Sequence, residues 1–212
     1  MKSLTNLLFF SLTFFLSAPT LAELADISRI FHQTPSLNRL EVCQGGGCAQ
    51  INQLSISPEE WESIAQLFQI KATNSADERL QISQAIGLLE QIVGAKNGTA
   101  SDRAGTFDNS HYQGQLDCND EAINTTTYMR LLKLNGLMPL HEIEDTRTRN
   151  FFFTGWPHTT AVIRDIKTNE RFAVDSWFYD NGHAAIVVPF KTWKANFQPA
   201  DSPIGQQAAK PK

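Results

Sequence analysis

The chain has 212 residues, of which 42% are hydrophobic, and its formal net charge at pH 7 is -4. A chain of this length and composition can bury the core of one globular domain, which argues against a disordered protein. The slightly acidic balance gives no positive field that would attract phosphate groups, which argues against a nucleic-acid partner.

The N-terminal residues have the three parts of a secretory signal peptide. Lys2 gives a positive start, residues 7–16 form an apolar run, and residues 17–22 are mostly small and end at Ala22. The apolar run is shorter than the roughly 20 residues that a membrane-spanning helix needs, and an uncleaved anchor is the alternative. We predict cleavage after Ala22 and a mature protein that is periplasmic or secreted, without stable insertion in the membrane.

Residues 37–55 predict a β-hairpin with a glycine-rich loop. Cys43 and Cys48 bracket the loop sequence Gln-Gly-Gly-Gly, and the residues on either side look like strand ends. A loop of this length sets the two cysteines opposite each other, near enough for a disulfide bond. The alternative, one half of a metal site, lacks a second pair of Cys or His residues at ligand spacing.

Two helices follow the hairpin, each preceded by a capping sequence. Residues 57–60, Ser-Pro-Glu-Glu, form a capping box with proline at the first helical position. Residues 75–78, Ser-Ala-Asp-Glu, repeat the pattern. The apolar residues expected on the buried faces are Trp61, Ile64, Leu67 and Phe68 in the first helix, and Leu80, Ile82, Ile86, Leu89 and Val93, leading to Gly94, in the second.

A third helix is expected after the polar loop at residues 96–115. Asp117 can cap it, residues 118–135 form it, and Gly136 ends it. Its apolar stripe contains Ile123, Thr127, Leu131 and Leu134. Three strands are expected to follow, at residues 159–166, 171–178 and 184–190, separated by polar turns.

These elements indicate a single α+β domain over residues 23–198 and a loose C-terminal tail over residues 199–212. No internal repeat or linker divides the domain. Residues 23–110 supply the hairpin and the first helices, and residues 111–198 are expected to carry the functional site.

The pairing of the other two cysteines leaves Cys118 as the odd one of three. In an exported protein an odd thiol is an intermolecular link or a reactive group. At a helix N-terminus the dipole and the unpaired backbone N–H groups favour a thiolate and can hold an oxyanion. The carboxylates of Asp117, Asp120 and Glu121 act in the opposite direction by raising the pKa of the thiol, so the site needs an imidazolium partner.

His158 and Asp175 are the candidate partners of this thiol. A four-residue turn at residues 167–170 would point both side chains to the same face of the sheet. That register pairs Asp175 with Val162, about 13 Å along the strand from His158, so a bulge or a different turn must bring the two together. The rival bases are His111, His141 and His183.

Each of the three candidates also has an ordinary structural interpretation. A buried cysteine such as Cys118 is most often a small core residue. His158 stands before a strand, where a histidine is often only a turn residue, and Asp175 can cap a turn. Their order along the chain, with a helix-start cysteine followed by a strand histidine and a strand aspartate, favours a shared functional site.

Residues 114–177 resemble the transglutaminase-like branch of the papain-like cysteine hydrolases. The resemblance rests on the sequence Asp-Cys-Asn-Asp-Glu-Ala at 117–122, on His158 before an apolar strand, and on Phe-Ala-Val-Asp-Ser-Trp at 172–177. It implies an antiparallel sheet packed against the helix that carries the cysteine. It also implies that Cys118 is the nucleophile, His158 its base and Asp175 the residue that orients the base.

The chain also resembles periplasmic bacterial transglutaminase-like peptidases, some of which bind calcium through acids next to the cysteine. The matching acids are Asp117, Asp120 and Glu121, but carboxylates at a helix N-terminus have a sufficient role there. We therefore expect no metal and no cofactor, with calcium as the alternative. Gln115 is the candidate oxyanion side chain, and the alternatives are Tyr112 and His111.

The function expected from these residues is that of an exported cysteine-dependent hydrolase or acyltransferase acting on amide bonds. A cysteine peptidase with a Cys-His-Asp triad is the leading form, and its partner would be a protein or peptide, including a component of the cell envelope. A peptidoglycan amidase and a protein cross-linking transglutaminase are the enzymatic alternatives. The alternative of another class is a non-catalytic binding module of the envelope with the same fold.

Overall fold

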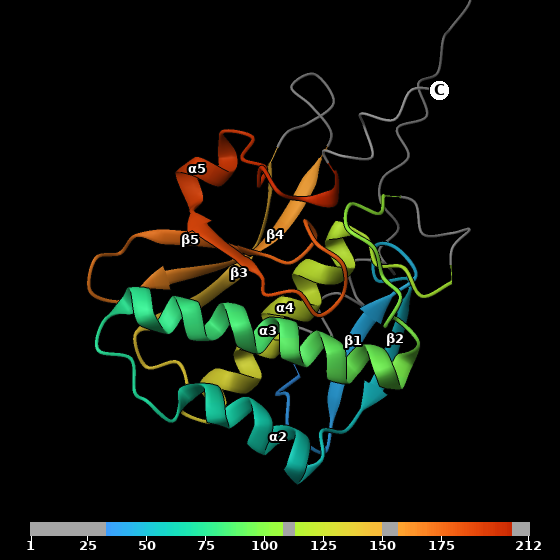
Figure 1. The fold of residues 1–212 in the computed structure, drawn as a ribbon, viewed down its shortest axis with the longest axis horizontal. Coiled ribbons are helices and arrows are strands. Elements are labelled where there is room, and N and C mark those ends of the chain that lie inside the picture. Colours follow the sequence, from blue (N-terminus) through green and yellow to red (C-terminus); the bar gives the residue numbers. More distant parts are fainter. Residues whose placement is uncertain (1–32, 108–112, 150–156, 205–212) are drawn as a thin grey trace, which may run out of the picture.

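The computed structural model describes residues 33–107, 113–149 and 157–204. The predicted signal peptide and its cleavage site lie outside these ranges, as do His111 and Tyr112. The described residues form helices and two antiparallel sheets, so the fold belongs to the α+β class (Figure 1). None of the helices in these ranges is long and apolar enough to cross a bilayer.

The N-terminal hairpin forms as the cysteine spacing predicts. Strand β1 (Leu40–Gln44) pairs with β2 (Gln50–Leu54), and a disulfide bond joins Cys43 to Cys48 across the glycine-rich loop. The loop glycines have positive φ values between 59° and 88°, a conformation that glycine adopts without steric cost. The loop can therefore turn its backbone N–H groups to one side.

Helix α2 (Pro58–Ala65) starts with the predicted capping box and continues into a short 3-10 helix (Gln66–Phe68). Ser57 Oγ accepts from Glu60 N, and the Glu60 carboxylate accepts from Ser57 N. Helix α3 (Ser75–Asn97) is capped one residue earlier than predicted, because the Asn74 side chain accepts from the backbone N–H groups of Ala76 and Asp77.

Two further details of α3 differ from the sequence prediction. Leu80 is 61% exposed and does not join the core. The helix also continues through Gly94 and ends at Gly98, which has a φ of 84°. Gly94 instead permits close packing, because a Cβ atom there would lie 3.0 Å from the backbone nitrogen of Ala100.

Helix α4 (Cys118–Leu134) begins at the predicted cap, Asp117, and ends at Asn135 and Gly136. Of its expected stripe, Ile123, Thr127 and Leu131 are buried, whereas Leu134 is 58% exposed. The helix contacts both sheets and α3 and lies at the centre of the molecule (Figure 1). Its N-terminus is therefore held from several sides.

The second sheet has the order β3-β4-β5-β6 with all pairs antiparallel. Strand β3 (His141–Arg149) was not predicted, because its sequence is mostly polar and lies at the edge of the sheet. The three predicted strands form: β4 is His158–Asp165, which has the predicted length and starts one residue earlier, whereas β5 (Arg171–Asp175) and β6 (Ile186–Pro189) are shorter than predicted. Helix α5 (Phe190–Lys194) follows directly.

One hydrophobic cluster contains residues from the hairpin, from α2, α3 and α4, and from strands of the larger sheet. The two segments at 23–110 and 111–198 thus contribute to the same core. Part of the expected loose tail is packed, since Ser202 is buried and its Oγ donates to the carbonyl of Phe178. Residues from 205 onward lie outside the described ranges.

Candidate functional site

Cys118 lies at the first position of α4 and is a free thiol, only 8% exposed. It borders a pocket of about 340 Å³. The other described residues that line the pocket are Phe107, Asp117, Asn119, Thr148, Pro157 and Thr159. The pocket thus lies between the start of the helix and strands β3 and β4.

His158 and Asp175 are brought together as the site hypothesis requires. The distance from His158 Nε2 to Asp175 Oδ2 is 2.7 Å, and both side chains are buried. The 13 Å offset expected from the assumed four-residue turn is absent, because Val162 pairs with Ala173 and not with Asp175. Arg164 pairs with Arg171, so the connection is two residues longer than assumed.

Asp165 explains the longer connection. Its carboxylate accepts hydrogen bonds from the backbone N–H groups of Lys167 and Thr168, so this residue belongs to the turn as well as to the strand end. Val174 consequently pairs with Ala161. The next residue, Asp175, lies two positions along β4 from His158 and on the same face.

The two ring nitrogens of His158 have different environments. Nε2 contacts Asp175, whereas Nδ1 is buried and has no hydrogen-bond partner among the described residues. The proton on Nε2 that this contact requires leaves Nδ1 of a neutral ring as an acceptor. The histidine therefore has one nitrogen oriented by a carboxylate and one available for proton transfer.

Aromatic rings connect this pair to Cys118. The His158 ring lies 4.5 Å from the Trp177 ring and 5.4 Å from the Phe178 ring, measured between centroids. Trp177 and Phe178 belong to the same buried cluster as Cys118. In addition, the backbone N–H of Thr159, the residue after His158, lowers the pKa of the Cys118 thiol.

Two residues that the sequence did not reveal complete the environment of Asp175. Trp193 of α5 is fully buried, and its Nε1 donates a 2.6 Å hydrogen bond to Asp175 Oδ2. The guanidinium of Arg149 lies 4.6 Å from the Trp193 ring centroid and also donates to the Trp193 carbonyl. Burial lowers the pKa of Arg149, and the charge of Asp175 opposes that effect.

The resting state of Cys118 differs from the thiolate expected from its helix position. Burial raises the pKa of the thiol to about 11, and the charges of Asp117 and Asp175 act in the same direction. The N–H groups of Thr159 and of Cys118 itself lower the pKa, but by less. A pKa of about 11 favours the neutral thiol near pH 7, so chemistry at this sulfur would require a base that removes its proton.

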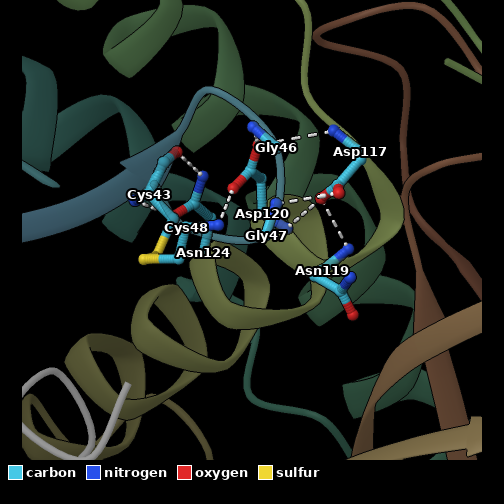
Figure 2. The surroundings of a disulfide bond; sticks show 8 residues. All are labelled: Cys43, Gly46, Gly47, Cys48, Asp117, Asn119, Asp120 and Asn124. Carbon is cyan, nitrogen blue, oxygen red and sulfur yellow. Dashed lines mark hydrogen bonds between the residues drawn. A yellow bond between two sulfur atoms is a disulfide. The ribbon is translucent and has the colours of Figure 1, made fainter. Parts of the chain in front are cut away.

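The glycine-rich hairpin loop binds the acids that flank Cys118 (Figure 2). Gly47 N–H donates to Asp117 Oδ2 at 2.8 Å. Asp120 accepts from Gly46 N–H at 2.8 Å and from Cys48 N–H at 2.6 Å. The amides thus offset part of the negative charge at the start of α4, a contact that the sequence analysis missed.

Glu121 faces a different set of partners from those of Asp117 and Asp120. It is buried beside Glu90 of α3 and Asp102, and it accepts from Ser176 Oγ at 3.2 Å. Burial is the main cause that raises the pKa of Glu121 well above its ordinary value, that of Glu90 to about 8 and that of Asp102 to about 6. Glu90, Asp102 and Glu121 thus form a buried carboxyl cluster in which burial favours the protonated forms.

The structure does not present Gln115 as an oxyanion donor. Its amide nitrogen donates to the carbonyl of Ser101, and its amide oxygen accepts from Arg103 N–H and Thr106 Oγ1. Both ends of the amide are used to hold the 101–106 loop, and Gln115 does not line the Cys118 pocket. The backbone N–H of Cys118 is the remaining candidate for an oxyanion donor, as expected from the helix start.

The rival histidines within the described ranges lie in other environments. His141 is fully buried against Glu78, with 2.8 Å between Nδ1 and Oε1, and joins β3 to α3. His183 stacks on Tyr179 with ring centroids 3.8 Å apart. Among residues 33–107, 113–149 and 157–204, no group of three or more His, Cys, Asp and Glu side chains is arranged to hold a metal ion.

Comparison of the chain with protein-family models, with characterised proteins and with solved structures gives no match.

Proposed function

We propose that this protein is an exported cysteine-dependent hydrolase or acyltransferase that acts on amide bonds, with a papain-like, transglutaminase-like fold. One observation carries the proposal: His158 is held by Asp175 through Nε2 at 2.7 Å, while its buried Nδ1 has no partner among the described residues. That nitrogen belongs to a ring packed on Trp177, which shares a buried cluster with the Cys118 thiol.

The chemistry follows from these roles. The Cys118 sulfur attacks the amide carbonyl carbon as its proton moves to His158 Nδ1, and the carbonyl electron pair moves onto oxygen. The Cys118 backbone N–H stabilises that oxyanion. When the C–N bond breaks, the leaving amine takes the proton from His158 and a thioester remains.

The second half of the reaction returns the free enzyme. Water or an amine attacks the thioester and gives a proton to His158 Nδ1. The C–S bond then breaks, and the sulfur recovers its proton from the imidazolium. Water as the acceptor gives a peptidase or amidase, whereas an amine gives a transglutaminase, and we propose peptide hydrolysis as the leading form.

A non-catalytic binding module of the cell envelope is the second candidate. The observation that favours it is the pKa of Cys118, which burial raises to about 11. A resting thiol is a weaker nucleophile than a thiolate, so catalysis depends on efficient proton removal by His158.

The test uses the oxidised mature chain with casein as a general acyl donor and with peptidoglycan peptides as a second donor. Hydrolysis is measured as new amino groups, and transfer as covalent incorporation of a fluorescent primary amine. We expect that Cys118→Ala abolishes turnover and that His158→Ala reduces the turnover rate about a thousandfold. If the Cys118→Ala protein turns over at the same rate as the unmodified protein, or if neither donor gives product, the result would support the binding module.

Export is part of the same proposal and is measured separately. The disulfide is compatible with an oxidising compartment. We expect mass spectrometry of the protein isolated from bacteria to find a mature N-terminus at Glu23. A chain that retains the first 22 residues would instead support the uncleaved anchor.

A further inference from the structure

The hairpin loop and the start of α4 are joined by hydrogen bonds that converge on two acids. Gly47 N–H reaches Asp117, and the N–H groups of Gly46 and Cys48 reach Asp120. On the other side of the loop, Asn124 Oδ1 accepts from Cys43 N–H at 2.6 Å, and its amide nitrogen donates to the Cys43 carbonyl at 2.9 Å. In Figure 2 the whole loop faces the first turns of the helix.

Of the two acids, Asp117 is the one whose charge affects the pKa of the Cys118 thiol. It precedes Cys118 in the chain, lines the same pocket, and its charge opposes formation of the thiolate. The other charges that bear on the site are Asp175, which also opposes the thiolate, and Arg149 behind Asp175. Three N–H donors already bind the carboxylate of Asp117: those of Asn119 and Asp120 in the helix and that of Gly47 in the loop.

We propose that the disulfide-closed loop is a positioning element of the Cys118 site. Its backbone N–H groups bind Asp117 and Asp120, and the contact with Asp117 offsets part of the negative charge next to the thiol. The Cys43–Cys48 bond keeps the loop amides pointing to one side. This role deepens the proposed function, because it gives the hairpin a part in activating the Cys118 nucleophile. It rests on the proposed function only in taking Cys118 as the reacting group.

The contacts of the loop account for a conflict in the sequence. Acids beside a nucleophilic cysteine oppose its ionisation, yet Asp117 is needed to cap the helix that presents the thiol. Amide donors from a separate element reduce this conflict, because the partial positive charges on their hydrogens offset part of the negative charge of the carboxylate. The unusual glycine content of the loop then has a chemical reason, since positive φ values turn successive N–H groups toward the acids.

The experiment measures how fast iodoacetamide alkylates Cys118 at pH 8 in variants that open the loop. The variant with Cys43→Ser and Cys48→Ser leaves Cys118 as the only cysteine in the chain, which makes the readout specific. Since pH 8 lies below the pKa of about 11, the rate is proportional to the thiolate fraction. We expect the double variant to react about tenfold more slowly, which corresponds to about one pH unit.

A double-mutant cycle with Asp117→Asn tests whether the loop affects the reactivity of Cys118 through the charge of Asp117. Asparagine retains the side-chain oxygen that caps the helix but removes the charge, so this variant alone is expected to react faster. In the Asp117→Asn background, opening the loop is expected to leave the rate unchanged within about twofold. A slowing of equal size in both backgrounds would overturn the route through Asp117.

The direction of the change separates this proposal from a purely structural role. Loss of packing alone would expose the thiol and raise the alkylation rate toward that of free cysteine, so an increase in the double variant would overturn the proposal. Thermal unfolding of each variant, measured in parallel, verifies that the folded protein is being labelled. Because alkylation requires no turnover, failure of the proposed catalytic function would leave this test intact.

Discussion

His158 and Trp193, which come from a strand and from the C-terminal helix, bind the same carboxylate oxygen. Asp175 Oδ2 lies 2.7 Å from His158 Nε2 and 2.6 Å from Trp193 Nε1. Two donors on one oxygen fix the position of the carboxylate, and the carboxylate in turn fixes the imidazole. Helix α5, which has no role in the sequence-based site, therefore supports the orientation of the His158 ring.

We predict that Trp193→Phe destabilises the protein by about 2 kcal/mol, because a buried hydrogen bond to a charged acceptor is lost while most of the ring packing is kept. Turnover should fall about tenfold with little change in KM, since the base is less well held. Chemical denaturation and steady-state kinetics measure the two effects. Trp61→Phe on α2 is the matched control, and equal kinetic losses in both variants would contradict a positioning role.

Asp175→Asn is predicted to change turnover and alkylation in opposite directions. Turnover should fall roughly a thousandfold, because the amide no longer selects the imidazole tautomer that leaves Nδ1 free. Iodoacetamide should react with Cys118 faster at pH 8, because the charge of Asp175 raises the pKa of the thiol. Parallel losses in both measurements would instead mean that the substitution disrupts the pocket.

The alkylation rate of Cys118 in the unmodified protein should rise about tenfold per pH unit up to about pH 11, where burial places the pKa of the thiol. Free cysteine, the reference, levels off near pH 8.5. Stopped-flow alkylation at several pH values provides the comparison. A plateau below pH 7 would show a resting thiolate–imidazolium pair in place of the neutral thiol.

Because of the buried carboxyl cluster, we predict that the free energy of unfolding decreases as the pH rises. Burial raises the folded-state pKa of Glu90 to about 8, so the folded protein holds a proton that the unfolded chain releases near pH 4.5. The stabilisation is complete below pH 4.5 and is lost as pH rises to about 8, with a slope of up to about 1.4 kcal/mol per pH unit for each proton. Urea unfolding at pH 5 and pH 8 measures the difference.

Glu90→Gln should reduce this pH dependence, because the amide carries no titrating proton and retains an acceptor for Gly182 N–H. The exposed Glu62 on α2 supplies the control variant Glu62→Gln, which should leave the dependence unchanged. Identical pH profiles for the unmodified protein and Glu90→Gln would place the pH-dependent protons elsewhere in the molecule.

Local chemistry made much of the fold predictable. Ser57 and Asp117 bind backbone groups within three residues of themselves, so these helix caps can be predicted from the adjacent residues in the sequence. The Cys43–Cys48 bond closes a loop short enough for its geometry to follow from its length. Features that depend on a few adjacent residues were therefore predicted well.

Features that depend on distant partners were not. Strand β3 lacks an apolar pattern and forms because the edge of β4 offers it hydrogen bonds. The β4–β5 register was also missed, although its cause is local: the Asp165 side chain accepts from the N–H groups of Lys167 and Thr168 and extends the turn. No spacing in the sequence connects Trp193 or Arg149 with Asp175, since only the folded chain brings α5 and β3 to that carboxylate.

The pairing of Glu78 with His141 bears on how far the chain can be shortened. The two side chains are nearly inaccessible and lie on opposite sides of the boundary at residue 110, as do the hairpin amides and the acids of α4. A chain that began at residue 113 would leave His141, Asp120 and Asn124 without partners that only the N-terminal half supplies. The hairpin and α3 thus belong to the smallest folding unit that can present Cys118.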